Sequence, residues 1–295
     1  MNANYFSKQS SLLSDYTCNV TGRKPKSTDC IGIFDSGIGG LTVADAIHRL
    51  LPEETLVYFG DTAHLPYGDK SPRLIRRYAL RITNFLLHEK KCKAIVIACN
   101  TASAAAYNLL RDKFKGTIPV INVIDPMIEA VIADDSIKKV GIIATKTTVT
   151  SGVYQEKFSR RKPSLKYSVL ATPLLASMIE EGFYDQKIST AVLSKYLSYR
   201  GFKNIDAMVL ACTHYPLIKD EIAAFFKDKI KIFDSAQVAA HKLKWILEKE
   251  KLAAKRKKRQ SVFYVSDYTE SFEKSTRIFF KGNIQLKHLP LWDKK

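Results

Sequence analysis

Two cysteines occur in matching settings, each directly after a short apolar run. Cys99 follows the run KAIVIA, and Cys212 follows the run AMVLA. Each run predicts a buried strand with a thiol at its C-terminal end, the edge where open α/β sheets bind ligands. Two thiols presented alike by two parts of one chain suggest two acid/base groups that face one substrate. The alternative is a pair of unrelated core residues, since free cysteine is among the most buried residue types.

Polar residues follow each cysteine, where a helix is predicted to begin. These residues are Asn100 and Thr101 in one case and Thr213 and His214 in the other. The free N–H groups of a helix N-terminus lower the pKa of a nearby thiol from its usual value of about 8.5. The polar side chains suit the binding of a carboxylate or the control of thiol protonation. Beside a thiol at a strand end, His214 is a functional candidate rather than only a structural histidine.

A glycine-rich turn follows the first predicted strand, residues 31–34. Its sequence is DSGIGG, which begins with Asp35 and Ser36 and leads into a helix. The glycines let the backbone approach a ligand, and the helix N-terminus offers N–H groups to an anion. The spacing is not GxGxxG, so it does not indicate a dinucleotide site. Asp35 either caps the turn or acts on a substrate, and the sequence leaves both open.

Three further acidic residues are weaker candidates. Asp61 lies in a long loop, residues 60–72, and loops of this length inside a compact domain are usually functional. Glu180 and Glu181 are adjacent near the end of a short predicted helix. One of these two carboxylates would have to face the active site, and their spacing does not choose between them.

Short apolar runs alternate with helical patterns, and the pattern restarts near residue 140. This predicts an α/β fold of two pseudo-symmetric lobes, each with a mostly parallel sheet flanked by helices. The active site is expected in the cleft between them, since domain interfaces are preferred sites for small molecules. We assign residues 31–128 and 237–295 to the first lobe and residues 129–236 to the second. Residues 1–30 are polar and are expected to form an N-terminal extension.

Composition limits the setting of the protein. The chain has 295 residues and five cysteines without C-x-x-C spacing, which argues against a disulfide framework and a structural zinc site. A reducing, cytoplasmic location is expected. No apolar run approaches the ~18 residues that span a membrane, and no secretory signal is expected. The scattered histidines predict no metal site.

The net charge of +18 is large and allows a second class of function, a nucleic-acid-binding protein. The densest basic run, residues 251–259, contains no aromatic residues, and no nucleic-acid-binding motif accompanies it. A solvated helix end and loop is the favoured interpretation, so nucleic acid is disfavoured as a partner.

Four separated segments carry a resemblance to a known family: IGIFDSGIGGLTV, YFGDTAHLPYG, VIACNTASA and LACTHYPLI. In this order they resemble the glutamate racemases of the cofactor-independent aspartate/glutamate racemase superfamily, from about residue 31 onward. The resemblance implies two lobes that close on L- or D-glutamate without a cofactor, in keeping with the lack of a lysine motif for pyridoxal phosphate. His214, Asp35 and Ser36 resemble the glutamate branch of the superfamily rather than the aspartate branch. A racemase for another amino acid, such as aspartate, remains the second enzyme hypothesis.

The resemblance also implies roles for individual residues. Cys99 and Cys212 would be the two bases on opposite faces of the α-carbon, with Asp35 assisting Cys99 and with Glu180 and His214 assisting Cys212. The implied substrate-binding residues are Asp35, Ser36, Tyr67, Gly68, Asn100, Thr101, Thr213 and His214. Asp61 matches a further acid of the family without a clear role.

The family's role implies a place in the cell and possible partners. D-Glutamate feeds bacterial peptidoglycan, so the resemblance implies a bacterial cytoplasmic enzyme. Some relatives carry N-terminal extensions linked to activation by a cell-wall precursor, and family members form homodimers of different geometry. The sequence leaves both the activator and the homodimer open, and the resemblance does not explain the net charge.

Overall fold

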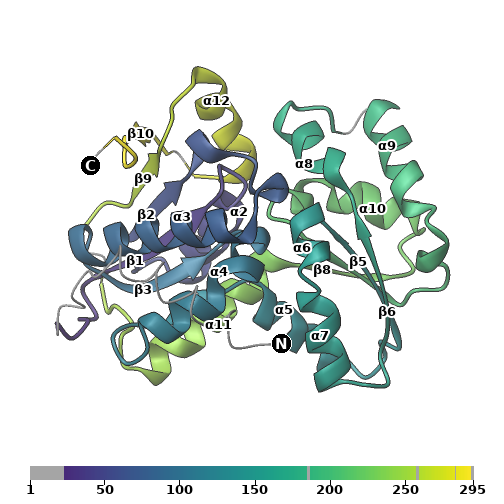
Figure 1. Cartoon of the computed structure of the whole chain (residues 1–295), viewed down its shortest axis with the longest axis horizontal. Coiled ribbons are helices and arrows are strands. Elements are labelled where there is room, and N and C mark those ends of the chain that lie inside the picture. The colour runs from purple at the N-terminus through teal and green to yellow at the C-terminus, as the bar shows by residue number, and fades with distance from the viewer. Residues whose placement is uncertain (1–22, 185–186, 257–258, 283, 294–295) are drawn as a thin grey trace, which may run out of the picture.

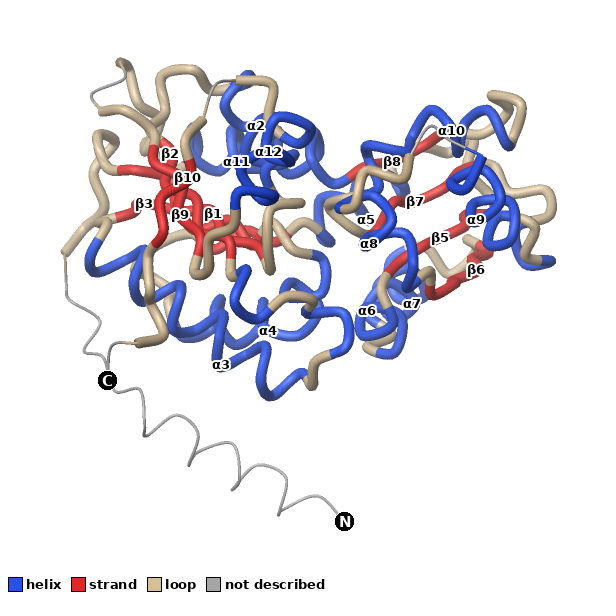
Figure 2. The backbone as a smooth tube through the Cα atoms, turned by 90° about the horizontal axis from the view of Figure 1, so that it is seen from above, coloured by secondary structure: helices blue, strands red, loops and turns tan. Residues whose placement is uncertain are grey.

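The computed structural model describes residues 23–184, 187–256, 259–282 and 284–293. These residues form two lobes that lie side by side, each built on one parallel sheet with helices around it (Figure 1). Seen from above, the two sheets occupy separate halves of the molecule, as Figure 2 shows. The predicted α/β class and the two-lobe architecture are therefore confirmed.

Within the described residues, the first lobe contains a six-stranded sheet whose neighbouring strands are all parallel. In spatial order the strands are β10 (Leu286–His288), β9 (Val262–Val265), β2 (Leu56–Gly60), β1 (Cys30–Asp35), β3 (Cys92–Ile97) and β4 (Val120–Asn122). The helices of this lobe are α2 (Leu41–Leu50), α3 (Pro72–Asn84), α4 (Asn100–Lys113), α11 (Ser235–Lys249) and α12 (Glu270–Phe279).

The central strand β1 is covered on both faces, which explains why it reads as a continuous apolar run. Ile31 and Ile33 belong to the hydrophobic cluster that includes the inner faces of α2 and α11. Phe34 points to the other face, into the cluster that includes α3 and α4. Polar side chains are therefore confined to the strand ends, where Asp35 closes β1.

The second lobe contains, as far as the structure describes it, a four-stranded parallel sheet. Its strands in spatial order are β6 (Lys166–Ala171), β5 (Lys139–Ala144), β7 (Ala207–Ala211) and β8 (Lys231–Asp234). Its helices are α5 (Ile124–Ile132), α6 (Lys146–Thr150), α7 (Val153–Arg161), α8 (Pro173–Glu180), α9 (Lys187–Leu197) and α10 (Lys219–Phe225).

The order of strands reveals the internal repeat that the sequence predicts. The order β2-β1-β3-β4 in the first sheet corresponds to β6-β5-β7-β8 in the second, when strands are matched by their sequence order. Cys99 follows β3 and Cys212 follows β7, so the two thiols occupy equivalent places in the two lobes.

The local structure after the two cysteines differs, which corrects one prediction. Cys99 is the N-cap of α4, as expected. Cys212 does not begin an α-helix, because a 3₁₀ turn over Tyr215–Ile218 follows it and α10 starts only at Lys219. The physical reason is Pro216, because an α-helix that begins after Cys212 needs the N–H of residue 216 to donate to the Cys212 carbonyl, and proline has no N–H.

The predicted lobe boundaries fall inside helices. The boundary after residue 128 lies within α5, and the boundary after residue 236 lies within α11, which packs against α2 of the first lobe. The boundaries themselves stay a prediction. Most of the predicted N-terminal extension, residues 1–22, lies outside the described residues. No described helix is both long enough and apolar enough to cross a membrane.

A buried ion pair supports the strand that delivers Cys99. Lys93, near the start of β3, is completely buried, and its ammonium contacts Glu54 Oε2 at 2.6 Å. It also donates hydrogen bonds of 2.7 Å to the carbonyl oxygens of Ser27 and Leu252. One cation therefore ties together the segment before β1, the turn before β2 and the connection after α11.

We expect the substitution Lys93→Met to lower the free energy of unfolding by about 3–5 kcal/mol, because it leaves the Glu54 carboxylate buried without its partner. Urea denaturation measures this change. The matched control is Lys244→Met, which removes an exposed lysine 4.0 Å from Glu248 and should cost about 0.5 kcal/mol or less. Equal losses in the two variants would contradict the role of Lys93.

Candidate active site

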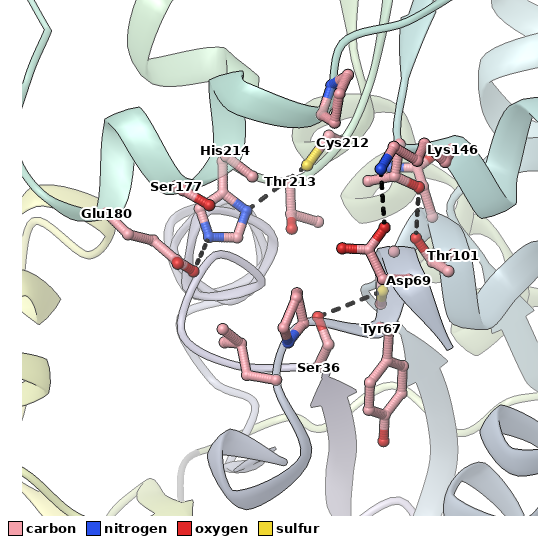
Figure 3. A pocket seen from close by; sticks show the side chains of 18 residues that line it. Ser36, Tyr67, Asp69, Thr101, Lys146, Ser177, Glu180, Cys212, Thr213 and His214 are labelled. Carbon is pink, nitrogen blue, oxygen red and sulfur yellow. Dashed lines mark hydrogen bonds and ion pairs between the residues drawn. The ribbon is translucent and has the colours of Figure 1, made fainter. Parts of the chain in front are cut away.

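The two lobes enclose a cavity of about 80 Å³ at the C-terminal ends of β1, β3, β5 and β7. Figure 3 shows side chains from both lobes pointing into it. The first lobe contributes Ser36, Leu65, Pro66, Tyr67, Gly68, Asp69, Cys99, Asn100 and Thr101. The second lobe contributes Thr145, Lys146, Pro173, Ala176, Ser177, Glu180, Cys212, Thr213 and His214. The structure therefore brings both predicted thiols into one cavity.

Cys99 is a buried thiol held by short-range contacts. The N–H of Ala102 donates to its sulfur at 3.4 Å, and the sulfur lies 3.6 Å from Ser36 Oγ. Burial, followed by the negative charge of Asp35, raises the pKa of Cys99 to about 12. The expected lowering by the helix N-terminus is therefore outweighed, and Cys99 is a protonated thiol near neutral pH.

Asp35 lies behind the cavity and is completely buried. Its Oδ2 accepts hydrogen bonds from the N–H groups of Gly37 at 3.1 Å and Gly40 at 2.9 Å, so it caps the glycine-rich turn. Its Oδ1 has no hydrogen-bond partner among the described residues. Burial raises the pKa of Asp35 against the opposing effects of His214 and these N–H groups. Asp35 does not line the cavity, and its contact with a substrate stays a prediction.

A chain of hydrogen bonds leads from Cys212 to a carboxylate. The sulfur of Cys212 lies 3.6 Å from Nδ1 of His214, and Nε2 of His214 lies 2.7 Å from Glu180 Oε1 (Figure 3). Burial by itself lowers the pKa of His214, but the hydrogen bonds to Cys212 and Glu180 raise it well above its ordinary value. His214 is therefore an imidazolium that can stabilise a thiolate on Cys212.

One glycine makes room for this imidazolium. A Cβ atom at Gly39 would lie 2.3 Å from Cε1 of His214, closer than atoms of neighbouring residues can approach. The ring of His214, from the second lobe, therefore rests directly on the backbone of the glycine-rich turn of the first lobe. A side chain at position 39 would push the two apart.

The floor of the cavity offers a free hydrogen-bond donor. Asn100 is buried, and its Oδ1 accepts a hydrogen bond of 2.9 Å from the hydroxyl of Tyr154 in the second lobe. This bond fixes the orientation of the side-chain amide. The amide Nδ2 is buried and has no partner among the described residues, which makes it a candidate donor to a ligand. Thr101 lies beside it and shares a hydrogen bond of 2.9 Å with Thr145 across the lobes.

Tyr67 and Asp61 are joined by a hydrogen bond beside the cavity. The hydroxyl of Tyr67 points away from the cavity (Figure 3) and donates a 2.6 Å hydrogen bond to Asp61. Tyr67 thus lines the cavity with its other atoms, next to Gly68. Asp61 is completely buried and does not line the cavity. The geometry therefore makes Asp61 a support for the loop.

Sequence reasoning missed several lining residues of the second lobe. Thr145 follows β5, the strand paired with β7, so the rule that locates Cys212 at a strand end could also have located Thr145. Ser177 lies on α8 one turn before Glu180, on the same side of the helix. Lys146 forms an ion pair of 3.5 Å with Asp69 between the lobes. None of these side chains lies in a recognisable motif.

Comparison with known proteins gives consistent matches. A model of the Asp/Glu/Hydantoin racemase family matches residues 31–243, well over half of the chain. The glutamate racemase of Geobacter metallireducens is 38% identical over 255 residues, which are 86% of this chain and 93% of that protein. Two solved structures extend the likeness to the fold.

The glutamate racemase of Francisella tularensis in complex with D-glutamate is 38% identical, with a TM-score of 0.84 over 90% of this chain and 99% of that one. The Escherichia coli glutamate racemase in complex with L-glutamate and the activator UDP-MurNAc-Ala is 26% identical. Its TM-score is 0.71 over 90% of this chain and 99% of that one. Relatives thus match both lobes.

We expect Glu180→Gln to lower the pKa of His214, because the Glu180 carboxylate stabilises the imidazolium. The ring would then lose its proton at a lower pH than in the wild-type protein. NMR titration of the histidine ring nitrogens measures the change. The control is Glu181→Gln, which alters the adjacent exposed carboxylate and should leave the pKa of His214 unchanged. An identical titration of wild type and Glu180→Gln would refute the assignment of Glu180.

Proposed function

This chain belongs to the Asp/Glu/hydantoin racemase family, and on that premise we propose that it is a glutamate racemase. It interconverts L- and D-glutamate and needs no cofactor. One observation of the molecule carries the proposal: two thiols, one from each lobe, line the same cavity, and Cys212 lies 3.6 Å from Nδ1 of His214.

Inversion at the α-carbon requires two proton-transfer groups on opposite faces of the substrate. A thiolate on one face removes the α-proton, and the electron pair of the broken C–H bond stays on the α-carbon and its carboxylate. The thiol on the other face then donates its proton to the α-carbon. The product is the mirror image of the substrate, and thiol and thiolate have exchanged places. No atom is gained and no redox change occurs.

The two sites are prepared for opposite roles in the free protein. Cys99, with a pKa raised to about 12, is the proton donor. Cys212, 3.6 Å from Nδ1 of the His214 imidazolium, is the proposed base. After one turnover the roles are reversed, so the same pair serves the reaction in both directions. Asp35 adjusts Cys99, and Glu180 adjusts Cys212 through His214.

Neutral donors are positioned to hold the carboxylates of glutamate. Asn100 Nδ2 is an unpaired buried donor. Asn100 is also the first residue of α4, so the backbone N–H groups of the helix N-terminus lie beside it. Ser36, Thr101 and Thr213 add hydroxyl groups around the cavity. A carboxylate bound to these donors withdraws electron density and stabilises the negative charge that develops at the α-carbon.

The cellular role is proposed from the family. D-Glutamate made here would supply peptidoglycan synthesis in a bacterial cytoplasm, and the four described cysteines are all free thiols, as a reducing compartment favours. The Escherichia coli relative was solved with the activator UDP-MurNAc-Ala, so this cell-wall precursor is the candidate activator to test here. A homodimer is the candidate assembly.

Purified protein should exchange the α-proton of glutamate for deuterium in D₂O without any added cofactor, because the thiols exchange with solvent between turnovers. NMR measures the loss of the α-proton signal, and chiral chromatography measures the inversion. Both L- and D-glutamate should react, and aspartate should not. Inversion of aspartate in place of glutamate would move the assignment to the other branch of the family.

Each of the substitutions Cys99→Ala and Cys212→Ala should lower the rate of racemisation by about 10²–10⁴-fold, because each removes one of the two proton-transfer groups. The matched control is Cys92→Ala. Cys92 is a buried cysteine at the start of β3, the strand that leads to Cys99, and it does not line the cavity. Its loss should leave the rate within about twofold of wild type. Normal turnover by either cleft variant would refute the two-base mechanism.

A further inference from the structure

One buried carboxylate outside the cavity accepts hydrogen bonds from four side chains. Asp61 Oδ2 accepts from the hydroxyl of Tyr67 at 2.6 Å. Asp61 Oδ1 accepts from Ser266 Oγ at 2.9 Å and from the indole Nε1 of Trp292 at 2.8 Å. Nδ1 of His64 lies 3.0 Å from both oxygens. The proposed reaction does not use this cluster directly.

The loop that begins at Asp61 forms one wall of the cavity. Residues 61–69 contain two 3₁₀ turns, Thr62–His64 and Tyr67–Asp69, and Leu65 to Asp69 line the cavity. The carbonyl of Gly68 accepts a 2.6 Å hydrogen bond from Thr147 of the second lobe. A shift of this loop would therefore change both the cavity wall and the contact between the lobes.

One of these four side chains, Trp292, comes from the C-terminal segment, residues 289–292. The N–H of Leu289 donates to Val265 at the end of β9, and Arg81 of α3 donates to the carbonyl of Leu291 at 2.7 Å. The Arg81 guanidinium also lies over the Trp292 ring, 5.6 Å from its centroid. These contacts hold the indole in place independently of its hydrogen bond to Asp61.

Trp292 also closes an aromatic cluster around the same loop. Its ring meets His64 edge-on at 4.5 Å and Tyr78 at 5.1 Å between centroids. His64 stacks on Tyr78 of α3 at 3.9 Å. The indole therefore contacts the loop both by packing and by a hydrogen bond to a charged acceptor, which is stronger than a neutral one.

We propose that Trp292 is a positioning residue for racemisation, which acts through Asp61 on the Tyr67–Gly68 wall of the cavity. This inference rests on the proposed glutamate racemase function. Trp292 itself does not line the cavity. Its N–H fixes the Asp61 carboxylate, and that carboxylate fixes the hydroxyl of Tyr67. A misplaced wall weakens substrate binding while leaving both thiols and their partners in place.

The first experiment compares Trp292→Phe with Trp245→Phe. The chain has two tryptophans, and Trp245 is about half exposed on α11, so it is the matched control. Phenylalanine keeps an aromatic ring but has no N–H donor. We expect Trp292→Phe to raise KM for D- and L-glutamate about tenfold with kcat within about twofold, since the wall binds ground state and transition state alike. Trp245→Phe should match wild type.

A double variant tests whether Trp292 acts through the Asp61–Tyr67 connection. Tyr67→Phe removes the hydroxyl that Asp61 holds. In this background Trp292→Phe should raise KM no further, because the connection is already broken. If KM of the double variant rises by the product of the two single-variant effects, the proposal is overturned. An unchanged KM in the single variant, or a loss confined to kcat or to the melting temperature, would also overturn it.

Hydrogen exchange of the backbone amides separates this proposal from the function on which it rests. Residues 61–69 should exchange faster in Trp292→Phe than in wild type or Trp245→Phe, and the amides of β7 should not change. This comparison needs no substrate. If the wild-type protein does not turn over glutamate, the proposed function is wrong. Hydrogen exchange of residues 61–69 would still decide whether Trp292 positions this loop. Unaltered exchange in Trp292→Phe would overturn the proposal.

Discussion

Burial of the two thiols is the physical constraint on which the proposed chemistry depends. Burial makes the thiolate form of Cys99 costly and so keeps this residue protonated. Burial also strengthens the ion pair between His214 and Glu180, since charges removed from water depend on each other. The two cysteines follow equivalent strands, yet their surroundings differ, because the charge of Asp35 acts on Cys99 and the His214 ring lies 3.6 Å from Cys212. This difference is what a two-base inversion needs.

Neither lobe contains a complete site, because polar groups that line the cavity from one lobe are oriented by contacts with residues of the other lobe. Tyr154 orients the amide of Asn100 across the cleft. The hydroxyl of Thr42, on α2, donates to the carbonyl of Thr213 at 3.1 Å, and the Gly39 backbone makes room for the His214 ring. Assembly of the lobes and formation of the site are therefore the same event.

Support for the cleft extends far beyond its lining. The Lys93–Glu54 ion pair anchors the far end of the strand that carries Cys99. After β2 of the same sheet, the Asp61 carboxylate joins the loop of Tyr67 to the C-terminal segment. Both are buried charges whose partners come from distant parts of the chain, so each specifies one arrangement of those parts. Loss of a single partner leaves an unpaired charge, which a folded protein tolerates poorly.

The sequence by itself determined the strands, the two equivalent thiols and the architecture of two α/β lobes, because apolar runs and strand-end residues are local signals. It could not show that burial outweighs the helix N-terminus at Cys99, or that Glu180 rather than Glu181 reaches His214. The interlobe contact of Thr145 and the Asp61–Trp292 bond were equally out of reach. Only the tertiary structure decided these points. Protonation and side-chain partnership depend on solvent exclusion and on residues that lie far apart in the chain.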